Sequence, residues 1–197
     1  MVIIEFMKSP VETHIKKYIS VTESEINLFQ SLLTELTVKA KKYLVKPGIQ
    51  LKHCYFVNKG CLKAYYLDKK GNKHVIQFAI ENWWVSDFEA FYHNLDIKLY
   101  IEAIEDSTLL AINQENLEIL FTKAPAFERY FRILLTNAFI GQRKRVFSSL
   151  EKNTKERYLE FCASYPNIEN RVQNYHIANY LGVSAESLSR IRSSLKC

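Results

Sequence analysis

A single glycine interrupts an apolar helical pattern near the end of this chain, and that interruption constrains the fold of the last quarter. Residues 176–190 read HIANYLGVSAESLSR. The apolar positions before the glycine recur at helical spacing: Ile177, Ala178 and Leu181. Gly182 can adopt the left-handed conformation that ends a helix, and Ser184 is a natural N-cap for a second one. We therefore expect two short helices joined by a tight turn.

The second helix should bury one face and leave the other open. Its inward positions are Leu188, Ile191 and Leu195, and its outward positions are Ala185, Glu186, Ser189, Arg190 and Ser193. This pattern is typical of a helix-turn-helix, whose second helix lies in the DNA major groove. An ordinary helical hairpin with a solvated polar face is the alternative.

The open face carries side chains that suit base and phosphate recognition. Arg190 can donate to guanine O6 and N7, and Glu186 can accept from cytosine N4. Serine hydroxyls, a second arginine and the helix N-terminus can bind phosphates. The predicted DNA-binding residues are Ser184, Glu186, Ser187, Ser189, Arg190 and Arg192.

Positive charge is concentrated in the same part of the chain. Residues 1–140 carry 17 Lys and Arg against 16 Asp and Glu, whereas residues 141–197 carry 10 against 5. A basic terminal unit favours a polyanionic partner, with nucleic acid ahead of an anionic membrane surface.

A chain of 197 residues is long enough to form a packed core without disulfide bonds or structural metal ions. Four scattered cysteines, Cys54, Cys61, Cys162 and Cys197, form no CxxC pair and have no histidines at metal-ligand spacing. The apolar segment 1–7 is too short for a signal peptide, and no run has the length of a membrane span. We expect a cytoplasmic protein without a metal, haem or iron–sulfur cofactor.

Within the first two thirds of the chain, the sequence pattern changes once, from helical spacing to short strand-like runs. Thr22 and Glu25 have capping-box spacing, and apolar residues follow at helical intervals: Ile26, Phe29, Leu32, Leu33 and Leu36. From about Tyr43, turn signals separate short runs rich in Tyr, Val, Ile and Phe, at 54–57, 61–67, 74–78, 101–104 and 108–112. Short strands at this spacing favour a sandwich or jelly roll.

A long helix should follow Pro125, from residue 126 to about 150. Steps of four and three predict a dimerisation seam of Phe127, Phe131, Leu134, Ala138 and Gly141, continuing to Arg145. A second stripe, Tyr130, Ile133, Ile140 and Phe147, is then expected to pack on the barrel. An amphipathic helix buried within a monomer fits the spacing equally well.

Two stretches resemble the Crp/Fnr superfamily of bacterial transcription regulators. Residues 177–191 (IANYLGVSAESLSRI) are similar to the family's DNA-reading signature, with Glu186, Ser189 and Arg190 at the Glu-x-x-Ser-Arg positions of the Fnr branch. Residues 55–71 (YFVNKGCLKAYYLDKKG) are similar to the family's barrel hairpins. The resemblance covers the chain from about residue 11.

The resemblance implies an α+β fold in three parts. These are a cyclic-nucleotide-binding-like jelly roll with N-terminal helices (1–125), a dimerisation helix (126–150) and an all-α helix-turn-helix unit (151–197). It also implies a homodimer on a pseudo-palindromic site in double-stranded DNA, RNA polymerase as a protein partner, and a small-molecule effector. Two departures stand out: Ala185 replaces a base-reading arginine of some members, and the sequence leaves no room for a β-hairpin wing after the last helix.

Cyclic AMP is not the expected effector. In cyclic-AMP-binding relatives a Gly-Glu-Leu triplet is followed by an Arg-Ser pair ten residues after the Glu, and the arginine pairs with the phosphate. Here the corresponding residues, which we take as candidates for an effector pocket, are Ser86, Asp87, Phe88, Ile97 and Lys98. Lysine is a less directional partner than arginine. Aromatic residues nearby, Trp83, Trp84, Phe88, Phe91 and Tyr92, suit either an apolar pocket or plain core.

Two other classes of function compete with DNA binding. A cupin-type enzyme would need a His-x-His pair, which the sequence lacks, so we expect no enzymatic activity. A ligand-sensing or protein-interaction module with degenerate DNA-binding function is the stronger alternative, because of the missing wing.

Overall fold

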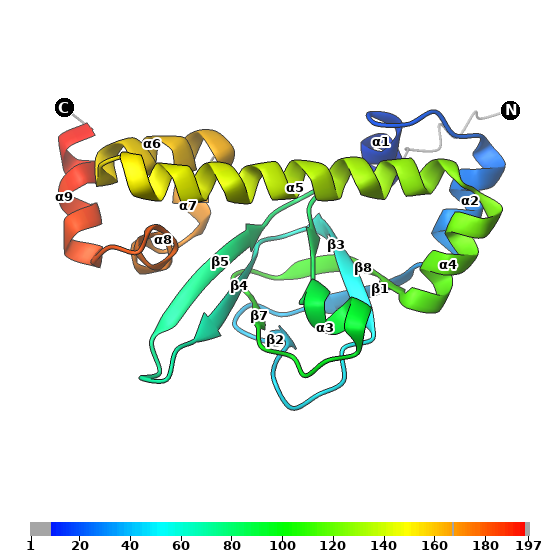
Figure 1. Cartoon of the computed structure of the whole chain (residues 1–197), viewed down its shortest axis with the longest axis horizontal. Coiled ribbons are helices and arrows are strands. Elements are labelled where there is room, and N and C mark those ends of the chain that lie inside the picture. Colours follow the sequence, from blue (N-terminus) through cyan, green and yellow to red (C-terminus); the bar gives the residue numbers. More distant parts are fainter. Residues whose placement is uncertain (1–8, 167, 196–197) are drawn as a thin grey trace, which may run out of the picture.

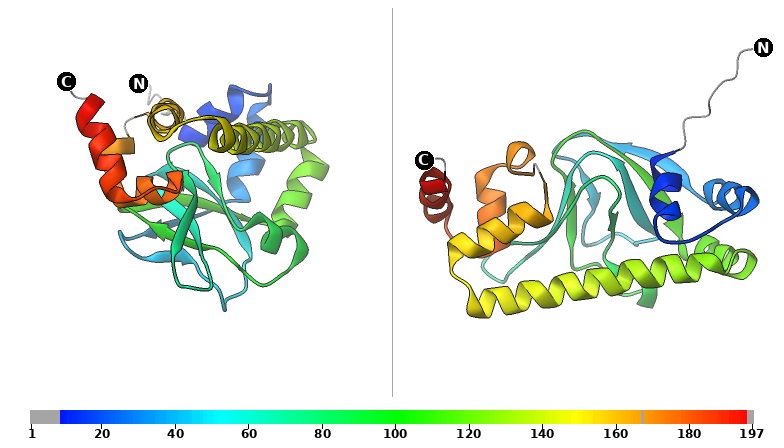
Figure 2. Two further views of the ribbon diagram at one scale, coloured as in Figure 1. Left: turned by 60° about the vertical axis from the view of Figure 1, so that its left-hand side comes forward. Right: turned by 90° about the horizontal axis from the view of Figure 1, so that it is seen from above.

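The computed structural model describes residues 9–166 and 168–195. Two sequence predictions, those for segment 1–7 and for Cys197, concern residues outside these ranges. A β-sandwich forms the centre of the molecule, a long helix runs across it, and the last helices gather at one end (Figures 1 and 2). The α+β prediction is confirmed.

The sandwich consists of two antiparallel four-stranded sheets, with strand orders β1-β8-β3-β6 and β2-β7-β4-β5. Its strands are β1 (Thr34–Val38), β2 (Tyr43–Val45), β3 (His53–Lys59), β4 (Leu62–Leu67), β5 (Lys73–Ala79), β6 (Trp84–Val85), β7 (Tyr100–Ala103) and β8 (Ser107–Asn113). All five runs expected to be strands are strands.

Three strands were not predicted: the short β2 and β6, and β1, which lies where a helix was expected to continue. The capping box at Thr22 is present, since Glu25 N donates to Thr22 Oγ1 at 3.2 Å and Thr22 N to the Glu25 carboxylate at 2.8 Å. Helix α2 (Glu23–Ser31) nevertheless ends before Leu36, which was expected to continue it. Leu36 instead lies opposite Leu109 of β8, where strand pairing satisfies the backbone of β1.

The tight turn between β3 and β4 depends on Gly60. Its φ is +114°, and a Cβ atom at this position would lie 2.7 Å from Ser107 Cα. Any larger side chain would therefore collide with the backbone at the start of β8.

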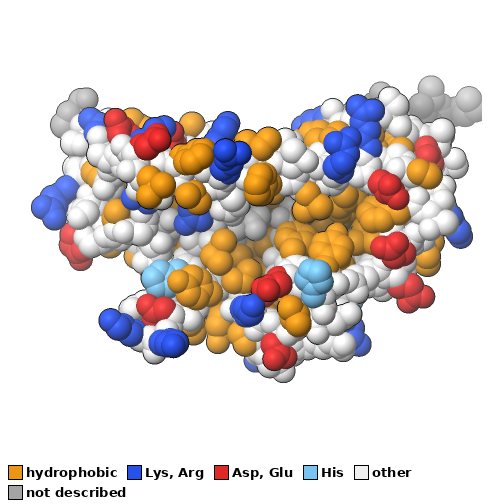
Figure 3. All heavy atoms as spheres, viewed as in Figure 1, with side chains coloured by type: hydrophobic (Ala, Val, Ile, Leu, Met, Phe, Trp, Pro, Cys, Tyr) orange, Lys and Arg blue, Asp and Glu red, His pale blue; other side chains and the backbone are white. Residues whose placement is uncertain are grey.

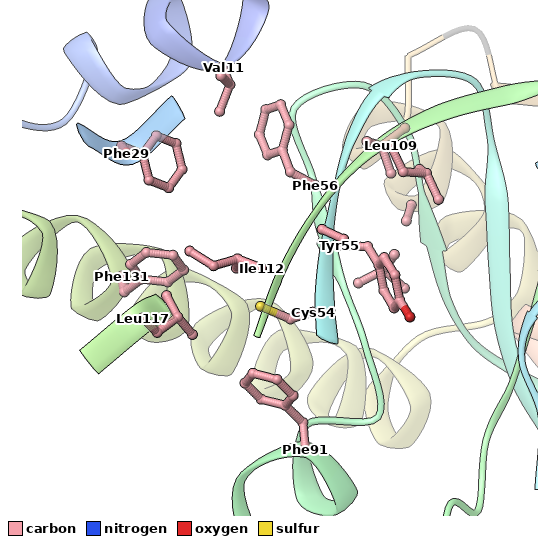
Figure 4. Close-up of a cluster of buried hydrophobic side chains, with 14 of the residues drawn as sticks. Val11, Phe29, Cys54, Tyr55, Phe56, Phe91, Leu109, Ile112, Leu117 and Phe131 are labelled. Atoms are coloured by element: carbon pink, nitrogen blue, oxygen red, sulfur yellow. The ribbon is translucent and has the colours of Figure 1, made fainter. Parts of the chain in front are cut away.

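Side chains from both sheets and from helices α1 to α5 form the main core. Phe29, Leu117 and Phe131, from α2, α4 and α5, lie around Ile112 of β8 (Figure 4). The predicted aromatic cluster largely belongs to this core, which contains Phe91 fully buried and Trp83, Trp84 and Phe88 packed against it.

Helices cover the sandwich on one side and extend beyond it. Their bounds are α1 (Pro10–Lys16), α3 (Phe88–His93), α4 (Gln114–Lys123) and α5 (Ala126–Glu151). Only the first turns of α5 are buried against the sandwich. None of the helices in the described part of the chain is long and apolar enough to cross a membrane.

The last four helices form a compact unit docked on the sandwich. They are α6 (Thr154–Ser164), α7 (Ile168–Arg171), α8 (Asn174–Leu181) and α9 (Ala185–Leu195). Phe78 of β5 contacts Phe161, Tyr165 and Tyr180 of this unit, with ring centroids 5.6–6.0 Å apart. A second core thus joins the helical unit to the sandwich.

Candidate nucleic-acid interface

The turn between α8 and α9 has the geometry that the sequence predicts. Gly182 ends α8 with φ +67° and ψ 36°, and Val183 N donates to Ala178 O at 3.0 Å. Ser184 Oγ then accepts a 3.1 Å hydrogen bond from Ser187 N and so caps α9. The two helices are fixed by backbone geometry as well as by packing.

Helix α9 has a buried face and an open face. Leu188 is fully buried, while Ile191 and Leu195 pack against the same core from positions nearer the surface. Opposite them, the exposed residues of α9 include Glu186, Ser189, Arg190 and Ser193. Arg190 and Glu186 lie one helical turn apart, so both can reach the same surface.

Neighbouring groups stabilise the negative charge of Glu186 on the open face. The pKa of Glu186 lies below its ordinary value because its own backbone N–H and the Ser184 hydroxyl hydrogen-bond the carboxylate, and Arg190 adds an attractive charge. Glu186 is therefore ionised at neutral pH and can act only as an acceptor.

The other predicted DNA-binding residues occupy the edges of this face. Ser184 is exposed, and its hydroxyl lies 3.1 Å from that of the half-buried Ser187. Arg192 is half-buried, and its Nη1 donates to Asn174 Oδ1 at 3.3 Å. Arg192 thus lies along the side of α9 facing α8, at one edge of the open face.

Sequence reasoning missed Asn174. Its Nδ2 donates to Ala185 O at 3.2 Å and to Ser189 Oγ at 3.1 Å, while its Oδ1 accepts from Arg192. One amide therefore connects the first residue of α8 to three residues of α9. An Asn at the start of the first helix was the available signal, but its partners depend on the angle between the helices.

The predicted dimerisation seam on α5 is wrong in its first half. Phe127 and Phe131 are buried in the chain's own core, where Phe127 stacks on Phe29 with centroids 4.9 Å apart, and Leu134 packs against the same core. Ala138 and Gly141 are exposed. Because α1, α2 and α4 cover the start of α5, the first half of this seam faces the protein's interior.

The opposite face of α5 is the exposed apolar one. Its members are Leu135, Phe139, Ile140, Val146, Phe147 and Leu150, each at least 44% exposed. Of the stripe expected to pack on the barrel, Tyr130 is buried in the core, whereas the expectation is wrong for Ile140 and Phe147. At 100° per residue these six positions cover one continuous face of the helix, and Figure 3 shows apolar side chains along α5 on the visible side.

Residues of the predicted effector pocket are engaged in internal contacts. The Asp87 carboxylate accepts hydrogen bonds from Ala90 N, Lys98 N and Leu99 N at 2.9–3.3 Å, and Ser86 Oγ donates to His53 O at 3.1 Å. Ile97 is buried and Phe88 half-buried. These contacts tie segment 86–99 together.

The ammonium group of Lys98 lies apart from that segment's interior. Its Nζ is 2.9 Å from Glu89 in an exposed ion pair. The structure thus brings the Lys98 backbone to Asp87 but keeps the side-chain charge at the surface, which does not support Lys98 as a phosphate partner inside a pocket.

Comparisons with known proteins agree with this arrangement. The family model described as "Cyclic nucleotide-binding domain" matches residues 35–124. The fumarate and nitrate reduction regulatory protein of Vibrio cholerae is 24% identical over 187 residues, covering 87% of this chain and 73% of its own. The chain therefore contains a cyclic nucleotide-binding domain and is similar in sequence to this Fnr-type regulator.

Solved structures share the fold of this chain. FixK2 from Bradyrhizobium japonicum aligns with a TM-score of 0.71 at 18% identity, covering 83% of this chain and 84% of its own. A putative Crp/Fnr-family transcriptional regulator from Eubacterium rectale aligns with a TM-score of 0.67 at 18% identity, covering 89% and 84%.

Polar contacts hold the last four helices on the sandwich. Arg171 is bidentate to Glu81, with both distances 2.9 Å, and also contacts Glu105 at 2.5 Å. Arg145 donates to three backbone carbonyls and lies 3.8 Å from the centroid of the Tyr180 ring. From the sequence, Arg171 was not identified as functional and Arg145 was placed on the dimerisation seam, because their partners here are 35 to 90 positions away along the chain.

A buried charged cluster lies in the same interface. Lys63 of β4 donates to Glu102 of β7 at 3.1 Å and contacts His176 Nε2 of α8 at 3.0 Å. The residues Lys63 and His176 are only 2% and 5% exposed. Within the described residues, His176 Nδ1 and Glu102 Oε2 are buried without a hydrogen-bond partner.

Proposed function

We propose that this chain is a sequence-specific, DNA-binding transcriptional regulator. The observation that supports this most directly is the open face of α9, where Glu186, Ser189 and Arg190 are exposed on a helix whose other face is locked into the core. A rigid helix with exposed donors and acceptors is what direct readout of the major groove requires.

The proposed contacts divide into base and phosphate recognition. Arg190 donates to guanine O6 and N7, and the ionised Glu186 accepts from cytosine N4. Ser184, Ser187, Ser189 and Arg192 contact phosphates beside the helix N-terminus. Asn174 holds Ser189 and Arg192 in position through the hydrogen bonds described above.

We propose that the chain acts as a homodimer. Each subunit has three functional parts: a sandwich domain (1–125), a dimerisation helix (126–150) and a DNA-binding unit (151–197). The exposed apolar face of α5 pairs with its copy, which sets two α9 helices about 34–36 Å apart, one duplex turn. RNA polymerase is the expected protein partner, and the cytoplasm the expected compartment.

We propose further that cyclic AMP does not control this regulator. The Asp87 carboxylate, which occupies the ribose-binding position of the family, is already bonded to three backbone N–H groups. No arginine occupies the phosphate-binding position in the sequence. An effector, if the chain uses one, has other chemistry.

Selection from random duplexes tests the function as a whole. The full chain should enrich a pseudo-palindrome with a G·C pair in each half-site, and its affinity should fall steeply with salt as counterions are released. Failure to enrich any sequence would favour a protein-interaction module.

Replacing Arg190 with alanine should cost about 1–3 kcal/mol of binding to the selected site and relax the preference at one base pair. The reason is loss of a bidentate contact that only guanine offers. Fluorescence anisotropy on the selected site and on single-base variants measures both effects.

Arg192→Ala is the matched control for Arg190→Ala. We assign the Arg192 guanidinium to the DNA phosphate backbone, so this variant should weaken binding to all DNA sequences alike. If Arg190→Ala also weakened every sequence equally, the base-reading role of Arg190 would be refuted.

A further inference from the structure

The hairpin formed by β4 and β5 carries a cluster of positive charge at its tip. Lys69, Lys70 and Lys73 are all exposed there, and Figure 3 shows Lys or Arg side chains at this lower left corner of the molecule. We propose that this tip contacts the phosphate backbone of the DNA that flanks the half-site read by α9. This inference rests on the proposed function.

The turn at the tip is rigid, and its one carboxylate is engaged internally. Asp68 Oδ1 accepts from Lys70 N and Asn72 N at 2.8 and 2.9 Å, while Oδ2 contacts Asn72 Nδ2 and His74 Nε2 at 2.9 and 3.1 Å. Gly71 N donates to Asp68 O at 2.9 Å and closes the turn. The lysine side chains are thereby presented outward from a preorganised loop.

The three lysines have no ion-pair partner in the described part of the chain. Lys73 Nζ lies over the ring of Tyr65 at 4.9 Å, and no salt bridge involves Lys69, Lys70 or Lys73. Uncompensated cations on a protruding loop favour a polyanion as the partner.

The hairpin is fixed relative to the helix-turn-helix. Arg145 donates to Ile76 O at 2.6 Å and Val75 O at 3.1 Å on β5, and the same guanidinium donates to Tyr180 O of α8 at 2.7 Å. One side chain therefore links the strand that carries Lys73 to the first helix of the motif. The base of the hairpin and the first helix of the motif are thus held together by one guanidinium group.

The β4–β5 hairpin and helix α8 also line the same cleft. Tyr66 and His74 of the hairpin form part of its wall, and residues 179–182 at the end of α8 form another part. Figure 1 shows the hairpin projecting from the sandwich toward the end of the molecule that carries α8 and α9. The tip and these two helices thus lie toward the same end of the molecule.

The tip lies close to this cleft. Lys70 is four positions before His74, which at about 3.3 Å per residue places its Cα at most ~13 Å from the cleft wall. Gly182, on the other wall, is three positions before the first residue of α9. The lysine tip and the start of α9 are therefore both neighbours of the same cleft.

The test uses the full chain and two duplexes that carry the selected palindrome. The short duplex ends at the half-sites, and the long one continues for about 15 base pairs on each side. Lys69→Gln with Lys70→Gln should lower affinity for the long duplex by roughly five- to tenfold and leave the short one unchanged. The salt dependence on the long duplex should become shallower by about 2 to 4 units of slope, since each lost phosphate contact removes about 0.9.

Lys17→Gln with Lys123→Gln is the matched control, because these exposed lysines belong to the opposite end of the molecule, where α1 and α4 lie. This variant should bind both duplexes normally. The proposal is overturned by equal losses on the two duplexes, by no loss on either, or by an equal loss in the control. A defect only in transcription with RNA polymerase, at unchanged DNA affinity, would also overturn it and assign the tip to a protein contact.

The outcomes separate this inference from the function on which it rests. Normal binding of the unaltered chain to the short duplex supports the proposed function, whatever the tip variants do. If the unaltered chain bound neither duplex, the proposed function would fail and the tip contact with it.

Discussion

Phe139→Glu with Phe147→Glu should convert the dimer to a monomer and lower the affinity for the palindromic duplex by about 100-fold or more. Phe139 is 67% exposed and Phe147 47%, both on the apolar face of α5. Introduced carboxylates would have to be buried next to their copies in the dimer, which is strongly unfavourable. A monomer loses the effective concentration that links two half-sites, typically a factor of 10² to 10⁴.

Analytical ultracentrifugation and anisotropy on the full palindrome measure the two effects. Ile49→Glu with Leu95→Glu is the matched control, since these residues are 47% and 50% exposed and lie on loops of the sandwich. The control should remain dimeric. If the α5 variant stayed dimeric with unchanged circular dichroism, this face of the helix would not be the interface.

The error over α5 shows what helical spacing can and cannot tell. Steps of four and three place Phe127, Phe131 and Leu134 on one face, and that face is real. The same spacing serves a helix that packs on its own chain and one that pairs with a copy. Only the position of α1, α2 and α4 around the start of α5 decides between them, and that depends on contacts distant in sequence.

The helix-turn-helix was more predictable because its determinants are local. Gly182, Ser184 and Leu188 act through backbone conformation, capping and burial within a few residues. Partners such as Asn174, Arg145 and Arg171 could not be read in the same way. Their roles arise from helix crossing and domain docking, for which a single sequence carries no periodic signal.

Strand β1 illustrates a third kind of limit. Leu33 and Leu36 continue a helical period, yet the chain leaves the helix because β8 offers a complete set of backbone partners from Thr34 to Val38. Tertiary pairing overrides local propensity when both satisfy the same apolar residues. Five of the strands that follow, β3, β4, β5, β7 and β8, were recognisable as apolar runs between turn residues, whereas the two- and three-residue strands β6 and β2 were too short to be recognised.

The docking of the helix-turn-helix on the sandwich should weaken in acid. His176 is buried against Lys63, and its pKa is lowered to about 4, first by burial and then by the charges of Lys63 and Lys73. The other groups facing it include Glu102 of β7, bonded to Lys63, and Tyr175 on its own helix. Freed from the interface, the imidazole would return to its ordinary pKa of about 6.5.

The sign follows from proton uptake. The docked state requires neutral His176, so docking is at full strength above about pH 6.5 and is lost progressively as the pH falls toward 4. The difference of about 2.5 pKa units corresponds to roughly 3 kcal/mol at its limit. The equilibrium constant for undocking should therefore rise about tenfold at pH 5.5. At pH 4.5 the free energy of undocking should fall by some 2–3 kcal/mol.

Trp83 provides a direct measure of docking, because it stacks on Tyr165 of α6's C-terminal cap with centroids 5.2 Å apart. In a Trp84→Phe background it is the only tryptophan in the sequence. Urea titrations of its fluorescence at pH 7.5, 5.5 and 4.5 should show the midpoint falling with pH.

His176→Gln isolates the histidine from other acid-sensitive groups. Glutamine keeps an acceptor for Lys63 but does not titrate, whereas the pKa of His14, also lowered to about 4, is left in place in both proteins. The urea midpoint should therefore depend less on pH between 6.5 and 4 in this variant, by the contribution that His176 makes in the unaltered chain. An unchanged dependence would mean that acid acts elsewhere, and the buried Lys63–His176 contact would then be a structural bond without a role in pH response.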